Sequence, residues 1–423
     1  MNFKKIMAGL AAGVMALSMA GTNVFAAGNY TAVAGDNSSA VVNKYLVLDG
    51  SAAVPDVTFN FVIEPGTAIA ASSGKMEVIS PSVATGVTGT PTIAPINFVH
   101  TDTKSDTVAQ GDNVTLDAGK TYVKHNTVID FSGVTFAEPG VYRWKVSETT
   151  ATYDHDSDSS TAALDISSRF DWDTQKGNTA TSKERYMDVY VTDNGSGNLV
   201  VSSYVLHDAA TDVTAGNDMG SADVATAGAA VGDKSDGYVN EFVSNDINIL
   251  KEVTGNQGSK DKYFDFTIVL GNAQPNTTYA VDLSNAEAIS GSNTATIAAN
   301  SGQTNATTIT TDSTGAATTH FFLKDSQNVT IQGLPIDATY AVTENAEDYK
   351  STAGVTAAIA TDGNAHTDAV NGTLARADIA TGYTNTRDGV IPTGVATAAA
   401  GALGLIALGV IGLVGKRRKA EED

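Results

Sequence analysis

One series of strand patterns occurs twice in this sequence, and this internal repeat constrains the fold more than any other feature. Each copy begins with an apolar stretch of period two that carries a lysine on its apolar face. Two aromatic stretches follow, the second ending in a glutamate in phase with its apolar residues, and a final stretch carries Gly-Tyr-x-Asn. The inward-facing polar residues are, in chain order, Lys44, Glu148, Asn240, Lys251, Glu344 and Asn385. The repeat predicts two domains of one architecture, each with three polar residues facing its core.

The rest of the sequence favours an all-β fold. Short alternating runs are separated by Gly, Asn and Asp, and no long segment of helical period lies between the two ends. Such a pattern is typical of antiparallel β-sandwiches. We expect a flexible leader at 27–40, an N-terminal domain with insertions at 41–246, and a C-terminal domain at 247–388.

Both ends of the chain predict export. Two lysines precede an apolar run, and small residues before Ala27 suit signal peptidase, so residues 1–26 predict a signal peptide. The uncharged stretch 395–415 is long enough to cross a membrane as a helix, and the basic cluster 416–419 stays cytoplasmic. The segment 389–423 is therefore a membrane stop.

The net charge and the lack of cysteine limit the possible functions. A formal charge of -22 argues against nucleic acid and anionic membranes as partners. An exported chain without disulfides needs another source of stability. The spacing Asp154-x-Asp156-x-Asp158 resembles the start of a calcium loop, but Ser159 replaces the expected glycine. We predict a solvated loop there, with no metal and no cofactor.

The three inward polar residues of each copy suggest a reaction. A charge on a core face is costly unless it is paired, and a Lys-Glu salt bridge at a sandwich rim explains one such set. Two sets in the same order favour chemistry. Burial lowers the pKa of a lysine towards the neutral nucleophile, and it keeps a carboxylic acid protonated. That acid can hydrogen-bond the Asn carboxamide oxygen and shuttle protons as ammonia leaves, which predicts an intramolecular isopeptide bond.

The C-terminal motif resembles a sorting signal. Ile391-Pro392-Thr393-Gly394, followed by the span and the basic tail, is similar to the signal of Gram-positive surface proteins in the short form seen in some pilins. The resemblance implies that a sortase cleaves between Thr393 and Gly394 and transfers the Thr393 carbonyl to an amine.

The repeat resembles the isopeptide-linked, immunoglobulin-like (CnaB-type) domains of Gram-positive sortase-assembled shaft pilins. The matching stretches are 136–148, 249–256, Phe264-Asp265-Phe266, Tyr238-Val239-Asn240 and Tyr383-Thr384-Asn385. By this resemblance the crosslinks are Lys44 to Asn240 and Lys251 to Asn385. Glu148 and Glu344 then promote the bonds, and Asn245 is the alternative to Asn240.

The resemblance implies a structural backbone subunit of a covalently polymerised pilus. In the family an acceptor lysine lies shortly before the first domain's Asn, and Lys234 fits that place. An ordinary surface lysine explains Lys234 equally well, and Lys183 is a competing candidate.

The expected partners are a sortase, identical subunits, tip and base pilins and peptidoglycan, with no nucleic acid. The expected location is the pilus or cell wall surface of a Gram-positive bacterium, with the precursor held in the membrane by its C-terminal span. A singly displayed wall-anchored adhesin is the alternative. An enzyme is not expected, because the six histidines are scattered and no nucleophile motif appears.

Overall fold

The computed structural model describes residues 39–70, 77–154, 163–173, 183–193, 199–211, 235–283, 305–356, 360 and 365–389. Within this part the chain forms strands and two short 3-10 helices, η1 (Val83–Thr85) and η2 (Ser167–Arg169). Neither described helix is long and apolar enough to cross a membrane. The predicted signal peptide, the sorting motif and the stretch 395–415 lie outside the described residues.

Two sheets form the first sandwich. One has the strand order β10 (Phe170–Asp171), β13 (Gly237–Phe242), β1 (Ser39–Asp49), β6 (Lys120–Asp130) and β4 (Thr92–Ile93). The other has the order β12 (Leu199–His207), β11 (Glu184–Asp193), β8 (Gly140–Tyr153), β2 (Val57–Pro65) and β5 (Ile96–Phe98), with β9 (Leu164–Asp165) beside β8. A small sheet of β3 (Val87–Thr88) and β7 (Thr135–Phe136) adds to this domain.

Two further sheets form the second sandwich. One has the order β17 (Thr308–Thr310), β16 (Thr278–Asp282), β19 (Asn328–Pro335), β14 (Ser244–Thr254), β23 (Ile379–Thr386) and β21 (Lys350–Ala353). The other has the order β18 (Ala317–Leu323), β15 (Phe264–Gly271), β20 (Thr339–Asn345) and β22 (Asn371–Thr373). The predicted all-β class with more than one sandwich is confirmed.

In each domain the first strand pairs in parallel with the last. β1 pairs with β13, and β14 pairs with β23. The alternation of β1 places Val42, Lys44 and Leu46 on one face, and all three are fully buried between the sheets. β1 is buried on its other face too, because Tyr45 packs in a second cluster with Tyr122. The core face that the sequence predicted is thus the inner face of the sandwich.

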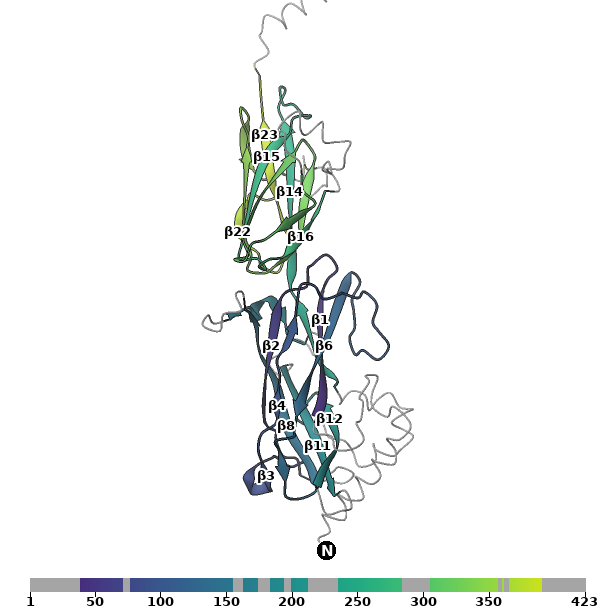
Figure 1. Ribbon diagram of the computed structural model, residues 1–423. Coiled ribbons are helices and arrows are strands. Elements are labelled where there is room, and N and C mark those ends of the chain that lie inside the picture. Colours follow the sequence, from purple (N-terminus) through teal and green to yellow (C-terminus); the bar gives the residue numbers. More distant parts are fainter. Residues whose placement is uncertain are drawn as a thin grey trace, which may run out of the picture.

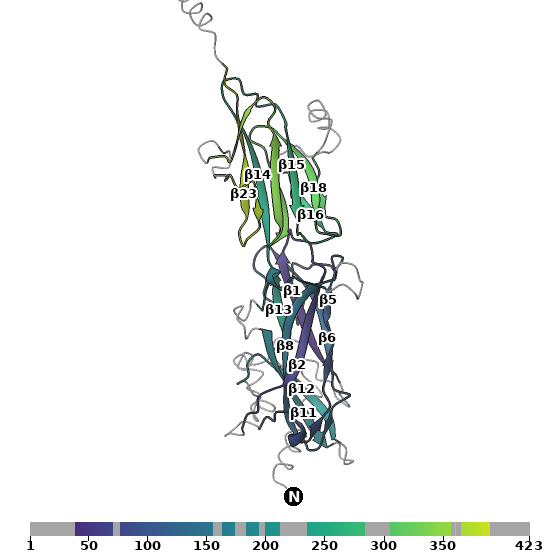
Figure 2. The ribbon, with the colours of Figure 1, turned by 90° about the vertical axis from the view of Figure 1, so that its left-hand side faces the viewer.

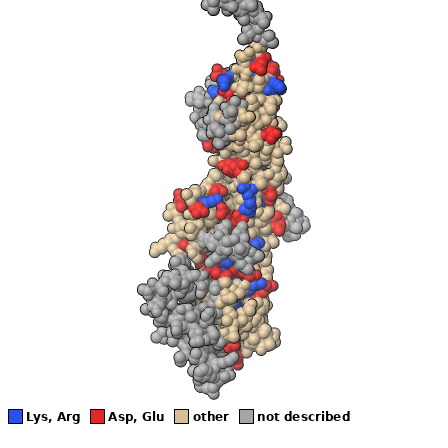
Figure 3. All heavy atoms as spheres, turned by 180° about the vertical axis from the view of Figure 1, so that it is seen from behind, with Lys and Arg blue, Asp and Glu red and all other residues tan. Residues whose placement is uncertain are grey.

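The two sandwiches are stacked end to end (Figures 1 and 2). β13 ends at Phe242 and β14 begins at Ser244, so only Val243 separates the domains. Contacts across the joint are Arg169 Nη2 to the Asn272 carbonyl at 2.7 Å, Gln274 Nε2 to the Asp56 carbonyl at 3.0 Å, and Arg376 to both Asp171 carboxylate oxygens at 2.7 and 2.6 Å. This short link and its polar contacts join the two sandwiches into one elongated unit. On the face shown in Figure 3, acidic side chains occur along its length with basic ones beside them.

Candidate isopeptide sites

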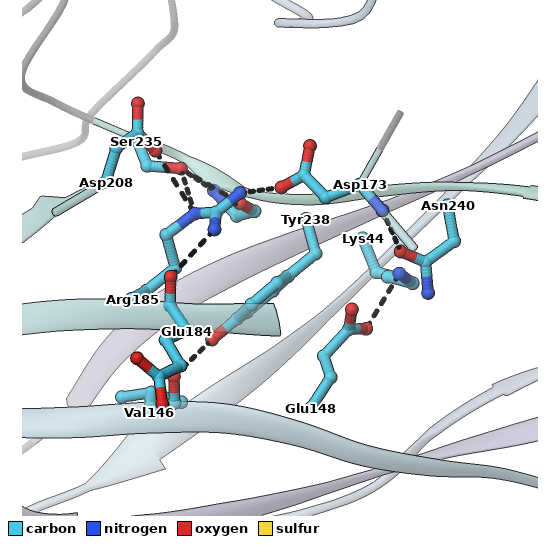
Figure 4. Close-up of polar contacts among 11 residues, drawn as sticks. Lys44, Val146, Glu148, Asp173, Glu184, Arg185, Asp208, Ser235, Tyr238 and Asn240 are labelled. Atoms are coloured by element: carbon cyan, nitrogen blue, oxygen red, sulfur yellow. Dashed lines mark hydrogen bonds and ion pairs between the residues drawn. The ribbon is translucent and has the colours of Figure 1, made fainter. Parts of the chain in front are cut away.

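The parallel pair of β1 and β13 builds the first site. In its register Lys44 lies opposite Tyr238 and Leu46 opposite Asn240, so Lys44 and Asn240 share one face of the sheet two residues apart. β8, in the facing sheet, supplies Glu148. Figure 4 shows the three side chains converging between the sheets. The structure therefore brings together Lys44, Glu148 and Asn240, which lie far apart in the sequence.

Lys44 and Glu148 form a fully buried ion pair. Lys44 Nζ lies 2.7 Å from Glu148 Oε1, and both side chains are excluded from solvent. Burial lowers the pKa of Lys44 to about 8, against the opposing effect of Glu148. The cost of burial therefore brings the lysine closer to its neutral, nucleophilic form, and the nearby carboxylate can accept its proton.

Asn240 completes the first site. Its Oδ1 accepts a hydrogen bond from the Asp173 backbone N–H at 3.0 Å. Its Nδ2 is buried and has no hydrogen-bond partner among the described residues. The alternative, Asn245, lies on β14 and donates to the Ala375 carbonyl at 2.6 Å. The geometry thus favours Asn240 over Asn245 as the partner of Lys44.

The second domain repeats the site on equivalent strands. β14 and β23 pair so that Lys251 lies opposite Tyr383 and Val253 opposite Asn385. Lys251 Nζ lies 2.6 Å from Glu344 Oε1, and neither side chain reaches solvent. Burial lowers the pKa of Lys251 to about 8, while Glu344 opposes that shift. Asn385 Nδ2 donates to Glu344 Oε1 at 3.1 Å, so all three predicted residues are in direct contact here.

Aromatic side chains surround both ammonium groups in the same way. Lys44 Nζ lies 4.4 Å from the centre of the Phe59 ring, and Lys251 Nζ lies 4.5 Å from that of Phe264. Such contacts partly offset the cost of burying a cation. They leave the amine in an apolar pocket.

A tyrosine links the sheets next to each lysine. Tyr238, opposite Lys44, donates its hydroxyl to the Val146 carbonyl at 2.7 Å. Tyr383, opposite Lys251, donates to the Val342 carbonyl at 2.9 Å. Each carbonyl belongs to the residue two positions before the site glutamate. The tyrosine of Gly-Tyr-x-Asn thus links the strand that carries the Asn to the strand that carries the Glu. The motif marks this tyrosine in the sequence but does not reveal the carbonyl that its hydroxyl binds.

The expected hydrogen bond from Glu to the Asn oxygen is found at neither site. At the second site Glu344 faces Nδ2 instead, and at the first site the Asn240 oxygen is held by a backbone N–H. A carboxylate paired with a lysine accepts hydrogen bonds, so it attracts the NH₂ side of the carboxamide. At the second site Glu344 is therefore placed to pass a proton to the leaving nitrogen.

The other predicted residues are distributed as follows. Ile391 to Gly394 and the acceptor candidate Lys234 lie outside the described residues. Lys183 is half-buried, with its Nζ 3.5 Å from the centre of the Trp172 ring, and burial lowers its pKa. The described residues contain no group of three or more His, Cys, Asp or Glu side chains suited to a metal ion.

Comparison with known families finds an isopeptide domain and a pilin among the proteins that this chain resembles. Residues 42–218 match the family described as the Spy0128-like isopeptide containing domain. Residues 245–387 match a domain of unknown function, DUF7601. The chain is 25% identical over 388 residues to a pilin of Streptococcus pyogenes serotype M1. This alignment covers 90% of each protein. The predicted resemblance to pilins with isopeptide domains is confirmed.

Two solved structures that align with this chain are major pilins. The major pilin of Streptococcus pyogenes aligns over 84% of this chain and 100% of its own, with 19% identity and a TM-score of 0.48. The major pilin protein T3.2 of the same species aligns over 84% and 99%, with 20% identity and a TM-score of 0.48.

Proposed function

We propose that this protein is the structural backbone subunit of a covalently polymerised cell-surface pilus. One observation carries the proposal: a buried Lys, Glu and Asn occur twice, in the same order and on equivalent strands. Two buried salt bridges alone would be a costly way to stabilise a domain. A covalent bond at each site explains why both domains bury a charged Lys-Glu pair despite its desolvation cost.

The reaction at each site is a transamidation. The neutral lysine Nζ attacks Cγ of the Asn carboxamide, forming the Nζ–Cγ bond while the Cγ–Nδ2 bond breaks. The glutamate accepts a proton from Nζ and returns it to Nδ2, which leaves as ammonia. No oxidant, cofactor or metal is needed. Because the fold holds the groups together, each site reacts once without an external enzyme.

The crosslinks suit a subunit under tension. Each one joins the first strand of a domain to its last strand. If Lys234 and Thr393 carry the load, tension runs through Asn240 to Lys251, crosses the second bond to Asn385, and bypasses the chain between Lys251 and Asn385. A chain without cysteine thereby gains covalent support outside the cell.

Polymerisation itself is proposed to be the work of a sortase. The enzyme would join Thr393 of one subunit to a lysine amine of the next, with Lys234 as the first candidate acceptor. β23, which ends at Thr386 shortly before the sorting motif in the sequence, lies in the second domain (Figure 1). A signal in this position suits head-to-tail joining. The mature protein would then reside in a pilus attached to the cell wall.

Intact mass tests the crosslinks. We expect the fragment 27–393 to weigh less than its sequence by two ammonia molecules, and Glu148→Ala and Glu344→Ala each to regain one. A mass equal to the bare sequence contradicts the crosslinks and leaves the lysines as buried ion pairs. Incubation of a longer chain, which keeps Gly394 and therefore the Thr393–Gly394 bond, with a pilus sortase then tests polymerisation: a ladder that disappears in Lys234→Arg supports the acceptor. A ladder that persists there but disappears in Lys183→Arg assigns the other lysine. A chain that forms no ladder fits a singly displayed adhesin.

A further inference from the structure

A turn outside the repeated pattern reaches the first site. β10 runs antiparallel to β13, with Phe170 opposite Phe242 and Asp171 opposite Glu241. The chain then turns inward, and Asp173 directs its backbone N–H at Asn240 Oδ1 from 3.0 Å. Asp173 has a φ of 45°, a left-handed conformation that is unfavourable for most residues other than glycine. Contacts from the surrounding structure must therefore hold Asp173 in this conformation.

Arg185 provides the restraint. Its Nη2 binds the Asp173 carboxylate, and both side chains are buried. The guanidinium is itself fixed on several sides, as Figure 4 shows. Its further contacts are Ser235 Oγ at 2.8 Å, the Gly237 carbonyl at 3.0 Å, the Glu184 carbonyl at 2.8 Å and Asp208 Oδ1 at 3.2 Å. The Tyr238 ring lies 4.7 Å from Arg185 Cζ. Asp173 is therefore anchored to a rigid group.

We propose that the Asp173 N–H polarises the Asn240 carboxamide during isopeptide formation, and that Arg185 is the positioning residue that holds this N–H in place. When Lys44 Nζ adds to Cγ, the pair of electrons in the Cγ–Oδ1 double bond moves to the oxygen. A fixed N–H donor stabilises that developing charge, as in an oxyanion hole. When the Cγ–Nδ2 bond breaks, the carbonyl re-forms and ammonia leaves. This inference rests on the proposed function.

The second site has no such donor. Asn385 Oδ1 is buried and has no hydrogen-bond partner in the described part of the chain. On the strand that borders β23, Ser351 lies opposite Asn385, and its hydroxyl donates to Glu344 Oε2 at 2.9 Å. The second site thus supports its carboxylate where the first supports its carboxamide. It serves as an internal reference in the same chain.

A matched pair of variants separates the role of conformation from that of charge. Asp173→Gly and Asp173→Ala both remove the carboxylate that Arg185 binds. Only glycine adopts the left-handed conformation at little cost, so only Asp173→Gly keeps the N–H on Asn240. The full chain is made by cell-free synthesis in mild detergent and quenched at intervals. Proteolytic mass spectrometry then follows the Lys44–Asn240 and Lys251–Asn385 peptides separately.

We expect Asp173→Gly to form the first bond within a few-fold of the wild-type rate and Asp173→Ala to be slower by roughly tenfold. The rate at the second site is expected to stay unchanged in both, which shows that the second sandwich has folded. Equal rates at the first site in the two variants, whether fast or slow, overturn the inference. A wild-type chain that never forms the first bond overturns the proposed function instead.

A pH series provides a second measurement. Arg185 also helps to lower the pKa of Lys44, so Arg185→Ala could act through the amine alone. That role would shift the pH dependence of the rate upward and leave its plateau unchanged. We expect a plateau reduced at least tenfold, and recovery in the double variant Arg185→Ala, Asp173→Gly. An unchanged plateau in Arg185→Ala overturns the positioning role.

Discussion

The two candidate sites share their reacting groups and differ in their surroundings. Lys44 lies in the middle of β1, between two apolar clusters that contain Val42 and Leu46. Lys251 lies near the outer end of β14, and exposed Ser351 contacts its glutamate. The lysine, the glutamate, the Phe ring and the Tyr hydroxyl recur in both. The contacts of the Asn carboxamide do not.

This difference shows which parts of the site the fold repeats. The first strand, the last strand and the two aromatic strands supply the same lysine, Asn, Tyr hydroxyl, glutamate and Phe ring in both domains. The contacts that differ come from the chain just after β10 in one domain and from β21 in the other. The edge of the sheet is thus where each domain adapts its site.

The largest expected effect comes from removing each crosslink. Asn240→Ala or Asn385→Ala eliminates the electrophile, and a crosslink that closes a loop of 100 residues is worth about 4.7 kcal/mol of unfolding free energy. Under force between the chain ends, the first variant should release roughly 650 Å of chain and the second roughly 450 Å, at about 3.4 Å per residue. Single-molecule stretching measures both lengths. A wild-type chain that extends by either length lacks the corresponding bond.

The two tyrosine hydroxyls should contribute differently to the free energy of unfolding. Tyr238 is fully buried and Tyr383 is only partly so. Tyr238→Phe leaves the buried Val146 carbonyl without its partner, and we expect a loss of about 1–3 kcal/mol in unfolding free energy. For Tyr383→Phe we expect about 0.5–1.5 kcal/mol, because water can reach that site more easily. Urea titrations in the matching Asn→Ala chains make the measurement. Equal losses would show that the two environments are energetically alike.

A carboxylate beside the second lysine should make the second domain more stable at acid pH. Glu252 follows Lys251, whereas Tyr45 follows Lys44. Burial, and next the nearby Asp325, raise the pKa of Glu252 from 4.5 to about 7. The folded state therefore binds the proton more tightly, so this contribution to stability is lost as pH rises from about 4.5 to 7.

Glu252→Gln should remove that dependence. The melting temperature of the second domain, measured across this pH range in the Asn385→Ala chain, shows the slope. A slope that survives in Glu252→Gln assigns the effect to another group.

The smallest expected effect is at Ser351. Its hydroxyl supports Glu344, but the residue is exposed and water can replace it. Ser351→Ala should slow formation of the second bond by about twofold, and Ser351→Thr should preserve the rate. Mass spectrometry of the crosslinked Lys251–Asn385 peptide measures this rate. A tenfold loss would make this hydroxyl as important as the N–H proposed at the first site.

The sequence by itself determined the repeat, the strand class and the inward direction of six polar residues. Alternation with period two assigns a face from local spacing alone, and β1 and β14, with 11 residues each, are long enough for that assignment. The very short strands were beyond this method. β4, with two residues, and β5, with three, are too short to show a period.

Only the tertiary structure decided how each carboxamide is held. Nothing in the residues around Asp173 places its N–H on Asn240, and Arg185 shows no pattern that ties it to Asp173. These contacts join segments that pair through long-range register: β10 lies beside β13 only because the sheet brings them together. The placement of Asn240 and Asn245 depends on tertiary structure in the same way: Asn240 lies on β13 beside Lys44, whereas Asn245, five residues later, lies on β14 in the second sandwich. Local spacing specifies the face of the sheet on which a side chain lies, but tertiary packing decides which groups that side chain contacts.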